Sequence, residues 1–183
     1  MRFFCLTAAI ALSLPLQALA ASNGLEPRAP KMILGWLEST RLAGADMRIK
    51  TKLDPGAKTS SLQGTNIEYF QRDGQTWVRF DFTDTDLDTE QQETHRLEGR
   101  LMRKVVIKRH GAPNVTRPVV SQQFCLFHQL YNTEFSLTDR AKFNYAMLLG
   151  RSFLADVALV DSSETFLSRP ACEGNTYVQD VLQ

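Results

Sequence analysis

One acidic loop carries the strongest chemical signal in the sequence. Asp54-Pro55-Gly56-Ala57 follows an alternating segment, and the small residues Thr59 and Ser60 come soon after it. An acid at the end of a strand, followed by a Pro-Gly turn, presents one carboxylate with backbone N–H groups around it. Hydrolysis by aspartates needs two carboxylates that share a proton, one to activate water and one to polarise the carbonyl. One loop supplies one aspartate, so this chemistry requires a twofold dimer that pairs two copies of Asp54.

The same loop is also consistent with an ordinary β-turn, because proline and glycine favour turns in any context. Such a turn would carry no chemistry. A purely structural β-domain therefore remains an alternative to a hydrolase.

Other hydrolytic chemistries lack residues to carry them. The histidines His95, His110 and His128 form no His-Glu-x-x-His arrangement. The sequence has no Gly-x-Ser-x-Gly elbow and no glycine-rich phosphate loop. We therefore expect neither a metal nor a cofactor.

The polar segment 83–94 contains Asp84, Asp86 and Asp88 at the spacing of a calcium loop. Such a loop needs glycine at its sixth position and a bidentate acid at its twelfth, and this sequence has Thr89 and His95 there. The segment is better interpreted as an exposed acidic loop.

The N-terminal residues are typical of an export signal. Arg2 precedes an apolar run from Phe3 to Leu16, and Ala18-Leu19-Ala20 has the small-x-small pattern of a signal peptidase site. The run is shorter than the roughly 20 residues of a membrane span. We expect a periplasmic chain that starts at Ala21 and has no membrane span. An uncleaved N-terminal anchor is the alternative.

Export would leave two cysteines, Cys125 and Cys172, where disulfides persist. A bridge between them would stabilise the fold by ~4 kcal/mol in the chain-entropy model. Two unrelated buried thiols are the alternative, and metal ligation is disfavoured.

Composition and charge limit the class of protein. A chain of 183 residues with 43% hydrophobic residues supports one packed domain. Its 21 basic and 20 acidic residues give a net charge of +1. Nucleic-acid binders usually have a basic surplus, so we expect no nucleic-acid partner.

Short strand-like segments must position the loop. Residues 47–53 alternate between apolar and basic side chains, and Asp73-Gly74 lies between two further runs, which predicts a hairpin over 65–82. The expected strands are 32–37, 47–53, 65–70, 76–82, 101–108, 118–127, 133–137 and 157–160. Only 151–156 reads as helix. This pattern predicts a small all-β barrel or sandwich.

The order of several motifs resembles a known family. Besides Asp54 to Leu62, the sequence has Ala146-Met147-Leu148-Leu149-Gly150-Arg151-Ser152-Phe153-Leu154, an apolar strand that ends in Gly-Arg and enters a short helix. Arg103 to Lys108 and Arg117 to Val120 lie between them. Together these segments resemble the bacterial retropepsin-like aspartic peptidases, some of which are labelled ATP-dependent zinc proteases. The resemblance covers roughly 33–160.

The resemblance implies a mostly β fold, a closed retropepsin-like barrel with one short C-terminal helix. The division would be 1–20 signal peptide, 21–31 flexible arm and 32–183 retropepsin-like domain. Asp54 would be catalytic, and Gly150 and Arg151 would give structural support. The active-site loop would consist of Pro55, Gly56, Ala57, Thr59 and Ser60. The chain would act as a homodimer on a peptide or protein substrate, and the hairpin 65–82 is a candidate flap. Some family members trim glutamate tails from a ribosomal protein, a cytoplasmic role.

One departure separates two functional hypotheses. The family loop normally reads Asp-Thr-Gly-Ala, whose threonine hydroxyl and N–H lock the two loops together, and Pro55 has neither group. The leading hypothesis is an exported aspartic endopeptidase. The alternative is a catalytically impaired protein of the same fold that binds peptides or a protein partner.

Overall fold

The computed structural model describes residues 30–109, 111–175 and 177–181, so the expected signal peptide and most of the expected arm lie outside it. The described chain is mostly strands, with one helix. The elements are β1 Met32–Leu42, β2 Met47–Asp54, β3 Ser61–Gln63, β4 Thr65–Arg72, β5 Gln75–Thr85, β6 Gln92–Ile107, β7 Val115–Leu126, β8 Gln129–Thr138, β9 Met147–Gly150, α1 Arg151–Val157, β10 Ala158–Thr165 and β11 Val178–Val181.

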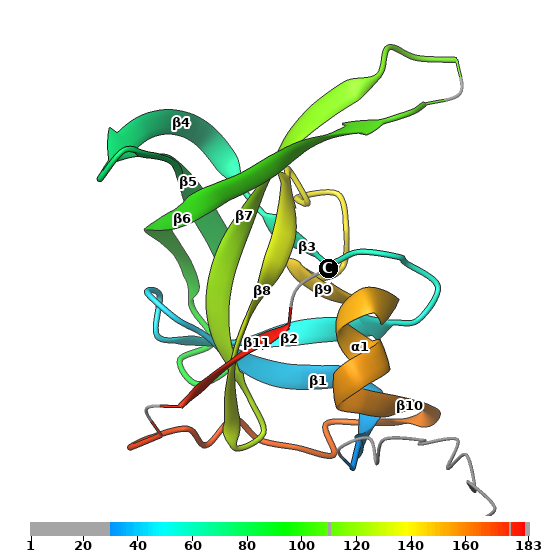
Figure 1. The fold of residues 1–183 in the computed structure, drawn as a ribbon. Helices are drawn as coiled ribbons and strands as arrows, with labels where there is room; N and C mark the ends of the chain where they lie inside the picture. Colours follow the sequence, from blue (N-terminus) through cyan, green and yellow to red (C-terminus); the bar gives the residue numbers. More distant parts are fainter. Residues whose placement is uncertain (1–29, 110, 176, 182–183) are drawn as a thin grey trace, which may run out of the picture.

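Six of these strands close into a barrel. They follow the order β1-β2-β9-β3-β8-β7, and the ring closes where Thr40 to Leu42 of β1 pair with Phe124 to Leu126 of β7 (Figure 1). The aromatic rings of Phe124, Phe135 and Phe153 pack together inside. The predicted fold class, a closed β-barrel with one short helix, is confirmed.

Strand β2 delivers the acidic loop to one end of the barrel. Met47, Ile49 and Leu53 are buried while Lys50 is exposed, as the alternation predicts. The strand ends at Asp54, so the side chains of even-numbered residues lie on the face away from the core.

The hairpin β4–β5 forms as predicted. Asp73 and Gly74 at its tip have φ angles of 51° and 71°. Two consecutive positive φ values fit a type I′ turn, whose twist matches that of the strands it joins.

The expectation of an exposed acidic loop over 83–94 holds only in part, because the loop itself is 86–91 and the residues on either side of it belong to strands. Strands β5 and β6 continue into it, with Thr83 paired to Thr94, and Asp86 is only 7% exposed. Asp86 Oδ1 accepts hydrogen bonds from the backbone N–H groups of Arg48 (3.2 Å) and Asp88 (3.0 Å). The carboxylate is buried because backbone donors from β2 replace its water.

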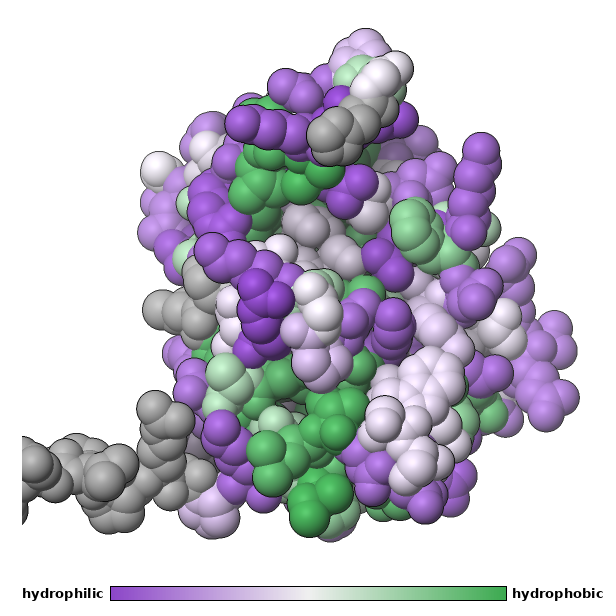
Figure 2. Space-filling model, turned by 90° about the vertical axis from the view of Figure 1, so that its right-hand side faces the viewer, coloured by the Kyte–Doolittle hydropathy of each residue, from purple (hydrophilic) through white to green (hydrophobic). Residues whose placement is uncertain are grey.

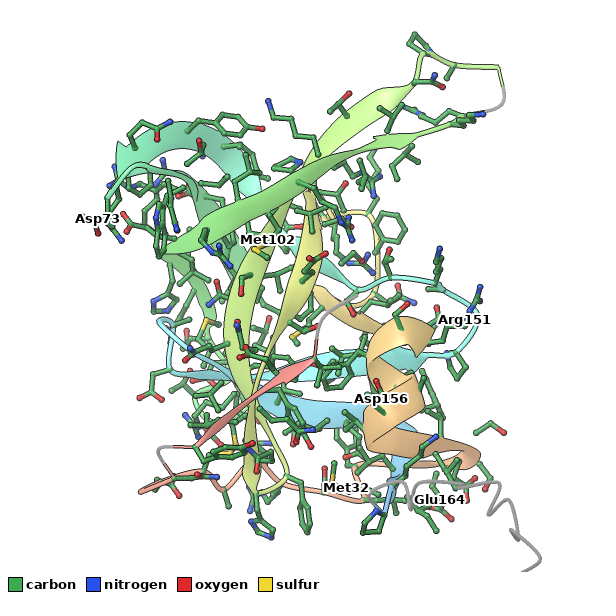
Figure 3. All side chains as sticks on the ribbon, in the orientation of Figure 1. Met32, Asp73, Met102, Arg151, Asp156 and Glu164 are labelled. Atoms are coloured by element: carbon green, nitrogen blue, oxygen red, sulfur yellow. A yellow bond between two sulfur atoms is a disulfide. The ribbon has the colours of Figure 1, made fainter. Side chains whose placement is uncertain are left out.

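Strands β6 and β7 extend beyond the barrel as a ribbon, here called the arm and defined as 103–109 with 115–119. Among the described residues, β5 pairs with β6 only up to Arg100, and β8 pairs with β7 only from Val119. The register of β6 against β7 shifts beside Met102, which Figure 3 labels at the base of the arm. From there the arm projects at the upper right of Figure 1. An irregularity of this kind turns a strand out of its sheet.

The end of the domain folds back on β1 and β8. Strand β10 runs parallel to β1, and Glu38 accepts hydrogen bonds from the N–H groups of Leu167 and Ser168, which holds the next segment down. Strand β11, which the sequence analysis did not predict, pairs in parallel with β8.

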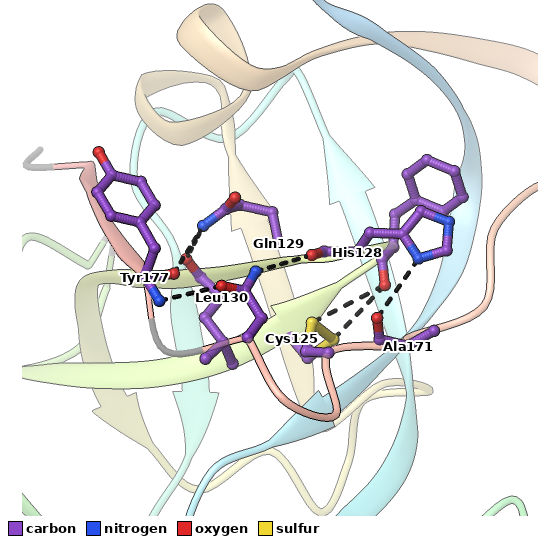
Figure 4. Close-up of a disulfide and its surroundings, with 9 residues drawn as sticks. Cys125, His128, Gln129, Leu130, Ala171 and Tyr177 are labelled. Carbon is purple, nitrogen blue, oxygen red and sulfur yellow. Dashed lines mark hydrogen bonds between the residues drawn. A yellow bond between two sulfur atoms is a disulfide. The ribbon is translucent and has the colours of Figure 1, made fainter.

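The predicted bridge between Cys125 and Cys172 is present and spans 47 residues (Figure 4). Beside it, Ala171 N donates to Phe127 O (2.6 Å). The disulfide therefore fastens the C-terminal segment to the turn between β7 and β8.

Candidate active site

The Asp54 carboxylate is held by a side chain and by its own loop. Its Oδ2 accepts a hydrogen bond from Lys52 Nζ (2.9 Å), and its Oδ1 accepts one from Gly56 N (3.0 Å). The Asp54 backbone carbonyl accepts from Ala57 N (3.1 Å), which closes the turn. The carboxylate is 24% exposed, so one side of it is open to a substrate.

These contacts lower the pKa of Asp54. The hydrogen bond from Lys52 is the largest cause, the Lys52 charge and the N–H groups of Gly56 and Ala57 add to it, and partial burial opposes them. In a single subunit Asp54 is therefore an ionised carboxylate, the form that a general base requires.

The start of α1 braces the loop from one side. Arg151 N donates to Ala57 O (2.9 Å) and Ser152 N donates to Lys58 O (3.1 Å). Arg151 also reaches Gly56 O (3.3 Å) with its guanidinium, and Figure 3 shows it at the end of the helix beside the loop. The free N–H groups of a helix start need such acceptors, so helix and loop fix each other.

Gly150 lets the strand before α1 approach the loop. A Cβ at this position would lie 2.5 Å from the carbonyl carbon of Thr59, a contact with backbone that no larger residue could make. Gly150 N donates to Ser60 Oγ (3.1 Å) across the same contact. The predicted supporting role of Gly150 and Arg151 therefore has a steric and a hydrogen-bonded basis.

Strand β8 braces the loop from the other side. Ser60 O accepts from the backbone N–H of Ser136 (3.1 Å) and from its hydroxyl (3.2 Å). The loop is thus fixed between β8 and α1, while Pro55 at its tip is exposed.

A hollow of about 450 Å³ lies beside Asp54 and is lined by Trp36, Lys52, Arg140 and Tyr145 among others. Arg140 is only 8% exposed and is held by contacts on several sides. Its guanidinium donates to Ser61 Oγ (2.7 Å) and Tyr145 O (2.8 Å), and it stacks on Phe143. The hollow therefore contains two cations, Lys52 and Arg140, next to one carboxylate.

The local field of the site is positive. Burial lowers the pKa of Arg140 and the charge of Arg117 lowers it further, whereas Asp54 raises it. Arg117 lies at the base of the arm, and burial and the nearby Arg109 lower its pKa too. The cations Lys52, Arg140 and Arg117 thus outnumber the single carboxylate of Asp54 in this region, and this excess of positive charge favours an anionic ligand.

The base of the arm lies directly against the loop. Thr59 and Ser60 line a small cavity together with Arg103, Val105 and Val119. In Figure 1 the arm projects on the same side of the barrel as α1, whereas the hairpin β4–β5 lies on the other side.

The predicted site residues come together around the loop, apart from the disulfide, which lies elsewhere. The sequence did not predict a role for Lys52, Arg140 or Trp36. The strand pattern could have identified Lys52, because a residue two positions from Asp54 in a strand points to the same face of the sheet. Arg140 had no local signal, since its partner Ser61 lies 79 residues away.

The described residues contain no group of three or more His, Cys, Asp or Glu side chains arranged to hold a metal ion. No helix in the described part of the chain has the length and apolar character to cross a bilayer.

Comparison with solved structures finds a close match of the fold. A Legionella pneumophila protein of unknown function, Lpg0085, superposes with a TM-score of 0.65 at 29% sequence identity, over 76% of this chain and all of that one.

Relatives in sequence are described as probable alpha-L-glutamate ligases. The protein from Shewanella pealeana is 33% identical over 64% of this chain, and that from Parasynechococcus marenigrum is 33% identical over 72%. The matched part makes up 25% and 28% of those proteins, so this chain corresponds to about a quarter of their length.

A family model described as retropepsin-like aspartic endopeptidase RimB matches residues 33–171, which include the loop, the arm, α1 and Cys125. This chain therefore belongs to the RimB-like family of retropepsin-like aspartic endopeptidases.

Proposed function

We propose that this chain is an aspartic endopeptidase that cleaves peptide or related amide bonds as a homodimer. The observation that carries the proposal is the Asp54 loop, which is braced by β8 on one side and by α1 on the other. Such bracing holds a carboxylate in the fixed position that catalysis needs.

Two copies of Asp54 would have to share a proton at the twofold axis. Close approach of two carboxylates raises the pKa of one of them, so one acts as acid and the other as base. The contact with Lys52 competes with this arrangement. Lys52 is 37% exposed and so has room to turn away when the second carboxylate arrives.

An apolar face next to the loop supports self-association. Ile33 and Leu159 are neighbours in the β1–β10 pair and are 66% and 58% exposed. A hollow of about 510 Å³ beside them is lined by Pro55, Leu154 and other residues. Figure 2, which looks onto this side of the molecule, shows apolar side chains gathered in its lower part. Exposed apolar patches of this kind favour a protein partner, here a second copy.

The substrate class follows from the cations of the hollow. Lys52 and Arg140 suit a carboxylate on the substrate, and Arg offers the bidentate geometry that carboxylates prefer. The relatives described as probable glutamate ligases support a substrate that contains glutamate. We therefore propose acidic peptides as the preferred substrates.

The arm is the better candidate for the flap. The sequence analysis favoured the hairpin 65–82, but Val105 and Val119 at the base of the arm lie against Thr59 and Ser60 of the loop. Closing the inner face of the arm over the hollow would exclude water from Asp54.

Export to the periplasm is part of the proposal. The signal-like N-terminus motivates it, and the disulfide between Cys125 and Cys172 fits an oxidising compartment. A tagged chain should be recovered from the periplasm without residues 1–20. Recovery in the cytoplasm with Met1 intact would contradict export.

A peptide-binding protein without catalysis is the second candidate. Pro55 has neither the N–H nor the hydroxyl that locks two family loops together, and Lys52 occupies the carboxylate. Both features weaken catalysis without affecting the hollow.

Activity on an acidic peptide library separates the two candidates. Asp54→Asn should abolish cleavage and leave the fold intact, because an amide cannot act as a general base. Pro55→Thr should raise activity, since misplacement at a catalytic centre costs ~100-fold in rate.

Binding data complete the test. If the wild type, Asp54→Asn and Pro55→Thr all bind acidic peptides and none cleaves them, the peptidase proposal fails and the binding protein stands. Sedimentation at micromolar concentration tests the dimer separately, and a strict monomer would count against paired catalysis.

A further inference from the structure

On the outer face of the arm Lys104 lies over the ring of Tyr69, whereas Val106 and Lys108 are exposed to solvent. Lys104, Val106 and Lys108 alternate with residues that face the loop, and Val106 is 60% exposed. A two-stranded ribbon outside a sheet exposes both faces and is only marginally stable alone. A surface that covers this face would therefore stabilise the arm.

The charge of this region has one sign. No Asp or Glu occurs from Gly99 to Thr133 in the sequence. The same stretch contains Arg100, Arg103, Lys104, Lys108, Arg109 and Arg117. Because the whole chain has a net charge of only +1, this positive region is a local concentration against a balanced background. It attracts an anionic partner.

Little of this positive charge is neutralised within the fold. Arg103 contacts Glu134 (2.6 Å), and Lys104 Nζ lies 4.8 Å from the centre of the Tyr69 ring, a contact that leaves its charge unneutralised. No ion pair to Lys108 or Arg109 is present in the described residues. These side chains are exposed and free to meet anionic groups outside the molecule.

The arm combines these cations with exposed aliphatic side chains. Val106 lies between Lys104 and Lys108 on the outer face, and Ile107 pairs with Val115 on the inner face. Aliphatic groups beside cations fit the boundary between acyl chains and anionic headgroups. Single-stranded nucleic acids are instead bound on aromatic side chains, and residues 99–123 contain no Phe, Trp or Tyr.

We propose that the arm docks this protein on the surface of an anionic lipid bilayer. Lys104, Lys108 and Arg109 would contact lipid phosphates, and Val106 would enter the interface between them. The contact is peripheral and needs no membrane-spanning segment. It uses the outer face of the arm, whereas the proposed closure over Asp54 uses the inner face, so the proposal applies to the peptidase and to the binding protein alike.

Flotation with lipid vesicles tests the proposal on the full chain after leader removal. The wild type should bind vesicles that contain phosphatidylglycerol and not vesicles of phosphatidylcholine alone, and added salt should release it. The triple variant Lys104→Gln, Lys108→Gln, Arg109→Gln should bind at least tenfold more weakly, since each cation near an anionic surface contributes. Val106→Asn should also weaken binding.

A matched control removes the same charge elsewhere. Lys50→Gln, Lys142→Gln and Arg169→Gln change three exposed cations outside the arm and should leave vesicle binding within twofold of wild type. Equal loss in both triple variants would show a non-specific charge effect and overturn the proposal. So would unchanged binding by the arm variant. Tighter binding of the wild type to a uridine oligonucleotide than to vesicles would replace the bilayer by nucleic acid.

Discussion

Lys52 Nζ lies 2.9 Å from Asp54 Oδ2, and the two residues project from the same face of one strand, two positions apart. The candidate catalytic carboxylate thus has a cation attached to it before any second subunit arrives. This contact is a reason for its lowered pKa and an obstacle that pairing of two subunits would have to remove.

Lys52→Met should raise the pKa of Asp54 towards its ordinary value, because the largest lowering cause is lost. A carboxyl with a lowered folded pKa stabilises the fold above its unfolded pKa, and this stability is lost as pH falls through the folded pKa. The variant should lose the Asp54 contribution at a higher pH than wild type does. Carbon-detected NMR titration of the Asp54 carboxyl measures the pKa. Lys50→Met is the control, and an equal pKa in Lys52→Met and wild type would contradict the assignment.

Gly150→Ala should destabilise the fold by about 2–4 kcal/mol, because the new methyl group collides with the Thr59 backbone and the loop must move. Gly74→Ala is the matched control. That glycine has open space around it and a φ of 71°, so its substitution should cost only about 1 kcal/mol. Urea unfolding of both variants gives the comparison. A smaller loss in Gly150→Ala than in Gly74→Ala would show that the loop is not held as described.

Arg140→Gln should weaken recognition of acidic substrates more than that of neutral ones. The substitution removes a cation from the hollow and leaves Ser61 Oγ and Tyr145 O without their guanidinium partner. We expect KM for a glutamate peptide to rise about tenfold or more, with a smaller change for an alanine peptide. Arg140→Lys should restore part of the difference. If KM rises equally for both peptides and the Tm falls, Arg140 has only a structural role, and the prediction is wrong.

Reduction of the disulfide should lower stability by about 4 kcal/mol, because the unfolded chain gains the freedom of the 47-residue loop. Cys125→Ser with Cys172→Ser should match the reduced wild type in a thermal melt. The double variant and the reduced wild type should both retain the Asp54 loop, since the bridge lies apart from it. A Tm that reducing agent leaves unchanged would show that the bridge is absent in solution.

The parts of the fold that could be predicted from the sequence are those determined by residues close together in the chain. The turn at Asp73-Gly74 and the alternation of β2 depend on neighbouring residues only. The exposed loop expected over 83–94 fails at Asp86, because a backbone donor 38 residues away, Arg48 N, helps to bury its carboxylate. Strand β11 was missed because its partner β8 is distant, and four residues carry little pattern of their own. Arg140 was missed for the same reason.

The parallel pairing of β1 with β10 has a consequence for how the domain forms. Met32 pairs with Ala158 and Gly35 pairs with Asp161, so β1 cannot complete its pairing until β10 has been synthesised. A chain that emerges from a ribosome or a translocation pore N-terminus first therefore cannot complete this sheet until the region beyond 165 has cleared the exit. Folds dominated by such distant contacts form slowly and leave strand edges open meanwhile. During that interval β1, which is rich in apolar residues, would be the segment that a chaperone must protect.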